Sequence, residues 1–144
     1  ERILGLELRA VDEKKRLTLG RKYPWILYRG SQAVLTESIL DCLAAERLYG
    51  THLTLISLNG VGCAKYTPEI VKHYGIKNVM LAVDADAAGQ ECQERILSLL
   101  RGVTVEVIDD HGRAGVKDLY ALLKKYQEQG GSHAGGNYRE NSGV

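Results

Sequence analysis

The sequence predicts an α/β fold, with a central, mostly parallel four-stranded sheet that is flanked by helices. Two observations support this prediction. After residue 30, short apolar segments alternate four times with segments of helical periodicity, and crossovers of this length return the chain to one sheet with a helix on its face. The chain also has 144 residues, of which 44% are hydrophobic, enough for one compact core.

The first 30 residues have the pattern of short strands instead. Apolar side chains lie at every second position from Leu4 to Leu8, and residues 16–19 and 25–28 are two further short apolar stretches. Alternation of this kind is typical of strands. We therefore expect a small antiparallel β extension, or an addition to the sheet edge, over residues 1–30.

This N-terminal section is also basic. It carries eight Lys or Arg against four acids, whereas residues 31–128 carry ten basic and thirteen acidic side chains. Such a layout is expected where one part of a protein holds cations and another approaches phosphates. Lys14, Lys15 and Arg16 are therefore candidate nucleic-acid contacts, although three adjacent charges are as typical of a solvated turn.

Four strand–helix units make up the expected main domain, residues 31–128. The expected strands are residues 33–36, 53–58, 79–83 and 103–108. The expected helices are residues 38–49, 67–74, 88–101 and 116–127. In the first helix, leucines recur on one face until Gly50 stops it. The second begins at Thr67 with a capping hydroxyl and Pro68 in its first turn, and ends at Gly75.

The later units follow the same logic. The third strand is five consecutive apolar residues, and the third helix places Ala88, Cys92 and Ile96 on one face. The fourth strand alternates, which indicates one exposed face and a position at or near the sheet edge. Residues 129–144 are polar and glycine-rich without an apolar period, so we expect this tail to be disordered.

Cysteine, histidine and hydropathy patterns exclude several classes of protein. The three cysteines are far apart in the sequence, which fits neither a disulfide framework nor a zinc site, and we expect them to be small buried side chains. We expect the four histidines at the surface or in loops. No stretch approaches the roughly 18 apolar residues of a membrane span, so we expect no membrane partner and a cytoplasmic location.

Acidic residues follow three of the four predicted strands. Glu37 follows the first, Asp84 and Asp86 follow the third, and Asp109 and Asp110 follow the fourth, where either could simply end the strand. The carboxyl ends of parallel strands meet at one edge of a sheet. Asp84 and Asp86 would project to the same side and repel each other, and a divalent cation such as Mg²⁺, held by one or two carboxylates, resolves that repulsion. Asp86 is alternatively the N-cap of the next helix.

Three motifs follow the first, second and third predicted strands. They are Thr36-Glu37-Ser38, Asn59-Gly60-Val61-Gly62 and Val83-Asp84-Ala85-Asp86-Ala87-Ala88-Gly89. In their order and spacing they resemble the Toprim domain of topoisomerases, bacterial primases, and OLD-type and recombination nucleases, over about residues 31–125. The primase-like members are most similar, because they share the Asp-x-Asp-x-Ala-Gly segment. Gly115-Val116-Lys117-Asp118-Leu119 is similar to their Gly-Lys-Asp segment, with an extra valine.

The resemblance implies roles for individual residues. Glu37, Asp84 and Asp86 would be catalytic and would bind Mg²⁺, or alternatively Mn²⁺, with Glu37 as general acid/base and Asp118 as a ligand of a second ion. The implied phosphate or nucleic-acid contacts are Gly60, Gly62, Lys65, Arg113 and Lys117. For the glycines a plain turn is the alternative, and for the three cations an ordinary surface charge.

The implied activity is magnesium-dependent nucleotidyl transfer, namely primer synthesis from nucleotides on single-stranded DNA. The chain opens on Glu1 rather than Met, and we expect it to belong to a longer protein with other domains, such as a helicase. The segment Gly5–Arg9 and the basic turn are similar to Toprim proteins of plasmids and conjugative elements. Two alternatives remain: a Toprim nuclease of the OLD type, and a non-catalytic nucleic-acid-binding module with a metal site.

Overall fold

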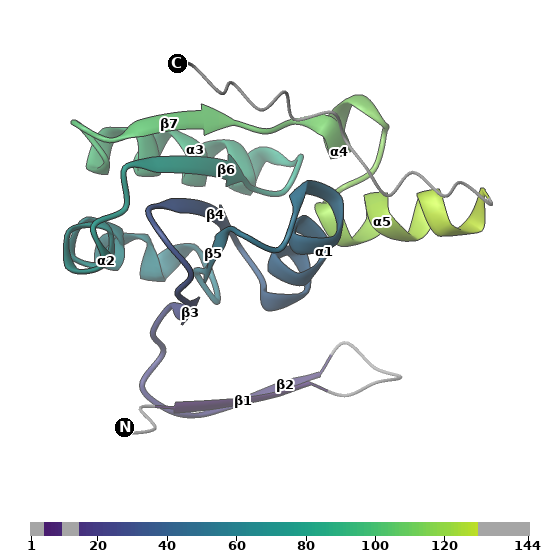
Figure 1. The fold of residues 1–144 in the computed structure, drawn as a ribbon. Coiled ribbons are helices and arrows are strands. Elements are labelled where there is room, and N and C mark those ends of the chain that lie inside the picture. The colour runs from purple at the N-terminus through teal and green to yellow at the C-terminus, as the bar shows by residue number, and fades with distance from the viewer. Residues whose placement is uncertain (1–4, 10–14, 130–144) are drawn as a thin grey trace, which may run out of the picture.

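The computed structural model describes residues 5–9 and 15–129. Lys14 and residues 130–144, the part of the tail for which disorder is predicted, lie outside these residues. A hairpin of β1 (Gly5–Arg9) and β2 (Arg16–Gly20) comes first, and its strands pair with each other in a two-stranded antiparallel sheet (Figure 1). No helix in the described part of the chain is long and apolar enough to cross a membrane.

The central sheet has five strands, one more than predicted. They are β3 (Trp25–Leu27), β4 (Gln32–Thr36), β5 (Thr54–Ser57), β6 (Asn78–Ala82) and β7 (Thr104–Val107). In the order β3-β5-β4-β6-β7, four strands are parallel and β3 is antiparallel to β5 at the edge. The predicted α/β class is confirmed. The extra strand comes from the stretch 25–28, which pairs with the main sheet rather than with the hairpin.

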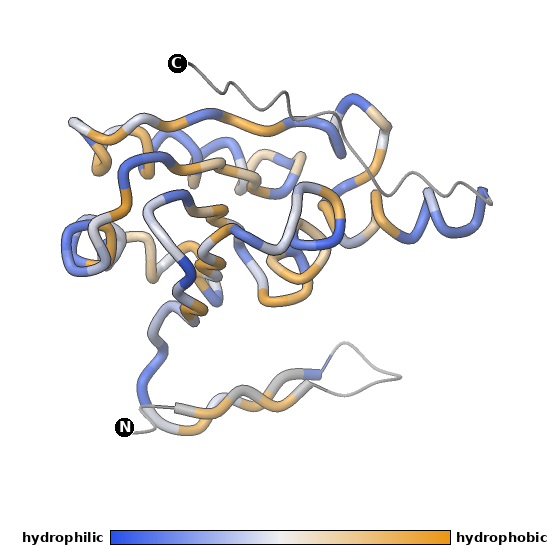
Figure 2. The backbone as a smooth tube through the Cα atoms, in the orientation of Figure 1, coloured by the Kyte–Doolittle hydropathy of each residue, from blue (hydrophilic) through white to orange (hydrophobic). Residues whose placement is uncertain are grey.

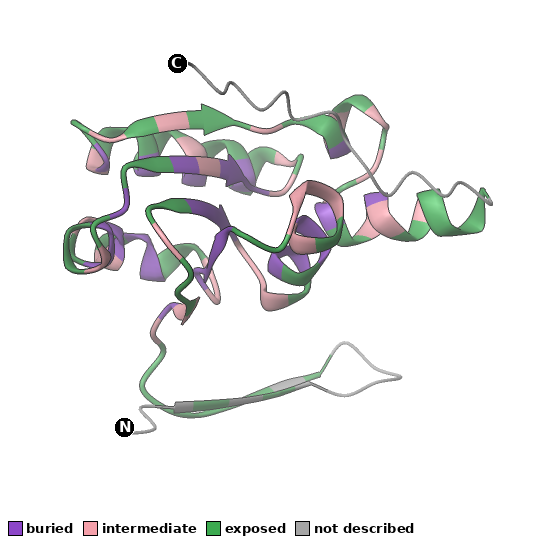
Figure 3. Ribbon diagram, viewed as in Figure 1, coloured by how far each residue is buried: buried purple, intermediate pink, exposed green. Residues whose placement is uncertain are grey.

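Helices lie on both faces of the sheet, and hydrophobic residues recur along its strands and helices (Figure 2). Alternate residues of β4, β5 and β6 enter two different cores. Leu35 and Leu81 pack into the core that contains side chains of α2 (Thr67–Tyr74) and α3 (Ala87–Leu99). Val34 packs on the other face, with side chains of α1 (Ile39–Tyr49) and α5 (Leu119–Glu128). The central strands are therefore buried on both faces (Figure 3).

The outer strand β7 differs from the central ones, because it pairs only with β6 among the described strands and is largely exposed. This confirms its predicted edge position. The three cysteines, Cys42, Cys63 and Cys92, are free and buried, as predicted.

Three local predictions were wrong. Thr67 does not cap α2, because its hydroxyl donates to the carbonyl of Ala64 instead. Ala64 lies in a 3-10 helix, Val61–Tyr66, into which the glycine loop, residues 59–62, continues. The last helix begins at Leu119 rather than at residue 116, since Asp118 caps it and a short helix α4 (Asp110–Arg113) intervenes. His111, on that short helix, is buried.

Candidate active site at the carboxyl edge of the sheet

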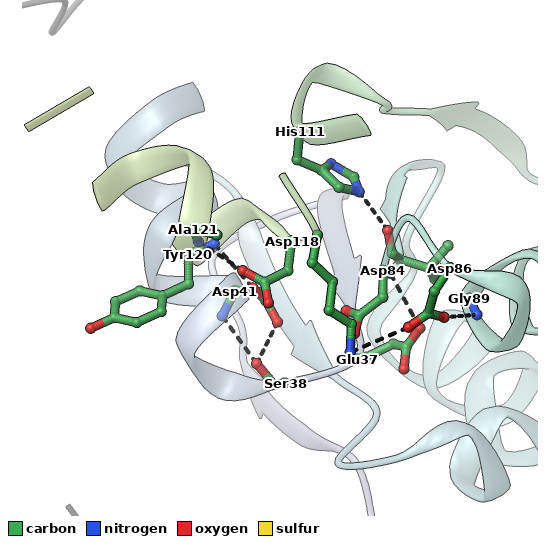
Figure 4. Close-up of polar contacts among 12 residues, drawn as sticks. Glu37, Ser38, Asp41, Asp84, Asp86, Gly89, His111, Asp118, Tyr120 and Ala121 are labelled. Atoms are coloured by element: carbon green, nitrogen blue, oxygen red, sulfur yellow. Dashed lines mark hydrogen bonds and ion pairs between the residues drawn. The ribbon is translucent and has the colours of Figure 1, made fainter. Parts of the chain in front are cut away.

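Glu37 and the aspartate pair meet because their strands are neighbours. Glu37 directly follows β4, and Asp84 and Asp86 follow β6, which pairs with β4 in parallel register. The Asp84 backbone N–H donates to Glu37 Oε1 at 3.2 Å (Figure 4). Glu37 and Asp84, 47 positions apart in the sequence, are thus held together by a hydrogen bond from the Asp84 backbone to the Glu37 side chain, as well as by the sheet.

Lys117 places a positive charge between the two aspartates. Its Nζ lies 2.8 Å from Asp84 Oδ2 and 3.3 Å from Asp86 Oδ2. The backbone is also joined here, since the Ala85 N–H donates to the Lys117 carbonyl at 2.7 Å. The segment after α4 is therefore fixed to the loop of residues 83–86, the aspartate loop, while the Lys117 side chain remains 59% exposed.

The electrostatic environments of Glu37 and Asp86 differ. Burial, followed by the charge of Asp84, raises the pKa of Glu37 above its ordinary value. The pKa of Asp86 is lowered, first by the hydrogen bond from the Gly89 amide and then by Lys117. The pKa of Lys117 is raised by its bonds to the two aspartates. Of these two carboxylates, Glu37 is thus the one that more readily takes up a proton.

Gly89 is required by a close backbone approach. A Cβ at this position would lie 1.9 Å from the carbonyl oxygen of Asp84, and no flexible side chain is available to move away. The Gly89 N–H also donates to Asp86 Oδ1 at 2.9 Å, which caps α3. The spacing of the Asp-x-Asp-x-x-Gly segment therefore has a steric cause: α3 begins directly against the backbone of Asp84.

A cavity of about 210 Å³ opens beside these carboxylates. Its lining includes Glu37, Asp84, Lys117, Asp118 and Tyr120. Asp118 caps α5 by accepting from the Ala121 N–H at 2.7 Å through Oδ1, which leaves its second oxygen available.

A buried aspartate that the sequence analysis did not single out supports this cavity. Asp41 accepts from the Tyr120 backbone N–H at 3.1 Å and from the Ser38 hydroxyl, and so joins α1 to the start of α5. Burial raises the pKa of Asp41. Its position in the first turn of α1, three residues after the capping serine, was the available sequence signal.

His111, on α4, also contacts the aspartate loop. Its Nε2 lies 2.7 Å from the carbonyl oxygen of Val83, next to Asp84. Its Nδ1 is buried and has no hydrogen-bond partner among the residues that the structure describes. Sequence reasoning missed it because one histidine in a glycine-containing turn has no apolar period around it.

The glycine loop borders a second hollow of about 400 Å³. Gly60 lines both this hollow and the acidic cavity, and Gly62 and Lys65 line only the second. Lys22, which the sequence analysis did not propose, also lines it, and its Nζ lies 3.5 Å from where a Cβ on Gly60 would be. A basic hollow thus adjoins the acidic cavity through one glycine.

The remaining candidates lie elsewhere. Arg113 is exposed on α4, outside the lining of both hollows. Lys15 is exposed and Arg16 begins β2 of the hairpin. Asp110 accepts a hydrogen bond from the Tyr49 hydroxyl at 2.8 Å, and Asp109 is the residue before α4.

The carboxylates fit a hard divalent cation that takes only one or two of its ligands from protein side chains. Within residues 5–9 and 15–129, no group of three His, Cys, Asp or Glu side chains is placed to hold a metal ion. Mg²⁺ does not need such a cage, because it is usually held by one or two carboxylates, waters and substrate phosphates. Asp84 and Asp86 already share one cationic group, the Lys117 ammonium, which supports a fit to that class of ion.

Comparison with known proteins confirms the resemblance and the fold. A family model described as Toprim-like matches residues 34–123, more than half of the chain. The primase fragment of the bacteriophage T7 primase-helicase protein superposes with a TM-score of 0.69 at 22% identity, over 88% of this chain and 55% of that one. The chain thus spans about half the length of the T7 fragment.

Two further solved structures match. One is the bacteriophage T7 lagging-strand DNA polymerase with primase domains of two gp4 subunits bound to an RNA/DNA hybrid and dTTP, with a TM-score of 0.59, 24% identity and coverages of 85% and 67%. The other is a small TOPRIM domain protein from Bacillus stearothermophilus, at 14% identity, a TM-score of 0.47 and coverages of 72% and 91%. No curated protein sequence matches the chain.

Proposed function

The chain belongs to the Toprim-like family, and from that premise we propose that it is the catalytic Toprim domain of a primase-like protein. It would join nucleotides on a single-stranded DNA template with the help of Mg²⁺. One observation carries this proposal: Glu37, Asp84 and Asp86 come together at one sheet edge, with a cationic group already between the aspartates. Likeness in fold to the T7 primase fragment supports a primase-like role in general.

Asp84 and Asp86 would hold the metal ion, and the second oxygen of Asp118 would assist with another. Bound Mg²⁺ supplies neutralisation of the charge that develops on the transferring phosphoryl group. Mn²⁺ is the expected alternative ion, since it also prefers oxygen ligands.

Glu37 is suited to proton transfer. Its Oε1 is engaged by the Asp84 N–H, which leaves Oε2 to accept the proton of the attacking hydroxyl while the new O–P bond forms and the bond to pyrophosphate breaks. A carboxylate is a better base when its pKa lies closer to the operating pH, and the pKa of Glu37 is raised.

The basic hollow would take phosphates of the nucleotide or the template. Lys22 and Lys65 provide two ammonium groups beside the glycine loop, where the absence of side chains at Gly60 and Gly62 allows close backbone approach. Because Gly60 borders both hollows, a phosphate there would lie next to the proposed metal. Arg113 and Lys15 would contact nucleic acid outside the two hollows. Nucleic-acid contact by Lys14 and Arg16 and origin on a mobile element stay predictions.

Primer synthesis tests the proposal. The 144-residue chain is incubated with labelled nucleotides, single-stranded DNA and Mg²⁺, and compared with Asp84→Asn and with Glu106→Gln, a control on the exposed strand β7. We expect product from the wild type and the control, and a loss of about 100-fold or more in Asp84→Asn, the order seen when a charge-stabilising group is removed. Equal product from Asp84→Asn would overturn the assignment.

The same samples separate the alternatives. Magnesium-dependent cleavage of DNA without nucleotides would indicate the nuclease. Unchanged DNA affinity in Asp84→Asn and Asp86→Asn, with neither synthesis nor cleavage by any sample, would indicate the non-catalytic module.

A further inference from the structure

We propose that Lys117 is an internal counterion that competes with the divalent cation for Asp84 and Asp86, so that metal binding releases its side chain into the cavity. The inference rests on the proposed function, because it concerns the same carboxylates. It assigns Lys117 a role in metal affinity in addition to any contact with phosphate.

The distances define the competition. One ammonium group contacts Oδ2 of both aspartates, at 2.8 Å and 3.3 Å. Asp86 Oδ1 is already engaged by the Gly89 N–H, so Oδ2 is the oxygen that Asp86 has left to offer a cation. Mg²⁺ binds oxygen at about 2.0–2.1 Å. An ion that close to these oxygens would occupy the space of the ammonium and would repel its charge.

The attachment of Lys117 allows the exchange without a change of fold. Its backbone is fixed by the hydrogen bond from the Ala85 N–H and by the start of α5 at the next residue. Its side chain has a flexible four-carbon stem and is 59% exposed. The ammonium can therefore leave the aspartates by side-chain rotation alone, and the cavity that it lines is where substrate phosphates would lie.

Charge balance gives the sign of the effect. Among the described residues, Lys117 is the cationic side chain that contacts Asp84 and Asp86, and Glu37 lies against the same loop. Removing the ammonium leaves the carboxylates to repel one another, which destabilises the metal-free form and favours the metal-bound form. Lys117→Met keeps the stem and removes the charge.

Binding of Mn²⁺ tests the inference without reference to activity. The free ion is followed by electron paramagnetic resonance for wild type, Lys117→Met, Lys117→Arg, Asp84→Asn and Lys72→Met. Lys72 is the matched control, since it is an exposed lysine in the last turn of α2, which ends at the opposite edge of the sheet, before β6 begins.

We expect Lys117→Met to bind Mn²⁺ about two- to fivefold more tightly than wild type, the factor that corresponds to one exposed ion pair. Lys117→Arg keeps the charge and should bind as wild type does, as should Lys72→Met, whose charge is distant and screened. In EDTA, Lys117→Met should melt at a lower temperature than wild type, and saturating Mn²⁺ should reduce that difference.

Two outcomes overturn different statements. If Asp84→Asn binds Mn²⁺ as tightly as wild type, or wild type binds none, the metal is not at these carboxylates, and both the proposed function and this inference fail. If Asp84→Asn loses the ion but Lys117→Met binds it no more tightly, the metal site stands and only the competition is refuted.

Discussion

Replacing Gly89 by alanine changes the free energy of unfolding through two effects of opposite sign. Gly89 is the third residue of α3, where alanine has the better helix propensity, by about 0.8–1 kcal/mol for an interior position. The added Cβ would, however, lie 1.9 Å from the Asp84 carbonyl oxygen and 2.8 Å from its carbonyl carbon. Helix propensity predicts a more stable chain, and the close approach predicts a less stable one.

The magnitudes favour the close approach. An ordinary contact begins at 3.4 Å, so the start of α3 and the Asp84 backbone must separate by about 1.5 Å. Overpacking of this kind costs typically 1–3 kcal/mol. The shift also stretches the capping bond from the Gly89 N–H to Asp86, and loss of an N-cap costs about 1 kcal/mol. After the gain in propensity, we expect Gly89→Ala to lower the free energy of unfolding by about 2 kcal/mol.

Urea unfolding followed by far-UV circular dichroism measures this difference. Gly30→Ala is the matched control, because a Cβ on Gly30 meets nothing within 4 Å, and its unfolding free energy should stay within about 0.5 kcal/mol of wild type. The folded fraction of Gly89→Ala should also bind Mn²⁺ more weakly, since both aspartates move. A variant as stable as wild type, or more stable, would show that propensity prevails and that the steric argument is wrong.

Two further predictions concern titrating groups. The pKa of Glu37 is raised by burial and by Asp84, so its ionisation costs stability: the cost is absent below the ordinary Glu pKa of about 4, grows as pH rises toward the raised folded value, and is constant above it. Glu37→Gln should therefore be more stable than wild type at pH 8 and equal to it near pH 4 in urea unfolding, and a pH-independent difference would contradict this. Burial raises the pKa of Cys42 to about 12 and that of Cys92 to about 11, so both thiols should react with a disulfide reagent at pH 8 far more slowly in the native chain than in urea; rapid labelling of native protein would refute their burial.

The convergence of Glu37 with the aspartates could be predicted because it depends only on strand order and direction. Apolar runs identify parallel strands, and their carboxyl ends must share an edge. The sequence left open whether residues 25–28 join the hairpin or the edge of the main sheet, since a strand of three residues carries too little pattern to choose a partner. The same holds for the four-residue helix α4 and for the burial of His111 on it.

The side-chain contacts across the site could not be predicted from the sequence either. Lys117 and Lys22 have no local signal that distinguishes them from other exposed lysines, because their partners lie in distant segments. Lys117 was predicted as a phosphate contact on resemblance alone, and its ion pairs with Asp84 and Asp86 depend on how the segment after α4 meets the aspartate loop.

The fold itself explains how a chain can gather these acids before any metal arrives. In a parallel α/β sheet each helix begins where a strand ends, so α1 and α3 start at this edge, capped by Ser38 and Asp86. The helix α5 follows α4 rather than a strand, but its cap Asp118 lines the same cavity. The amino ends of helices carry partial positive charge, which stabilises nearby carboxylates. Capping and metal binding are therefore not exclusive alternatives for an aspartate here. Asp86 gives one oxygen to the Gly89 amide and the other to the Lys117 ammonium, and exchange of that ammonium for a divalent ion would leave the cap, and with it the helix, in place.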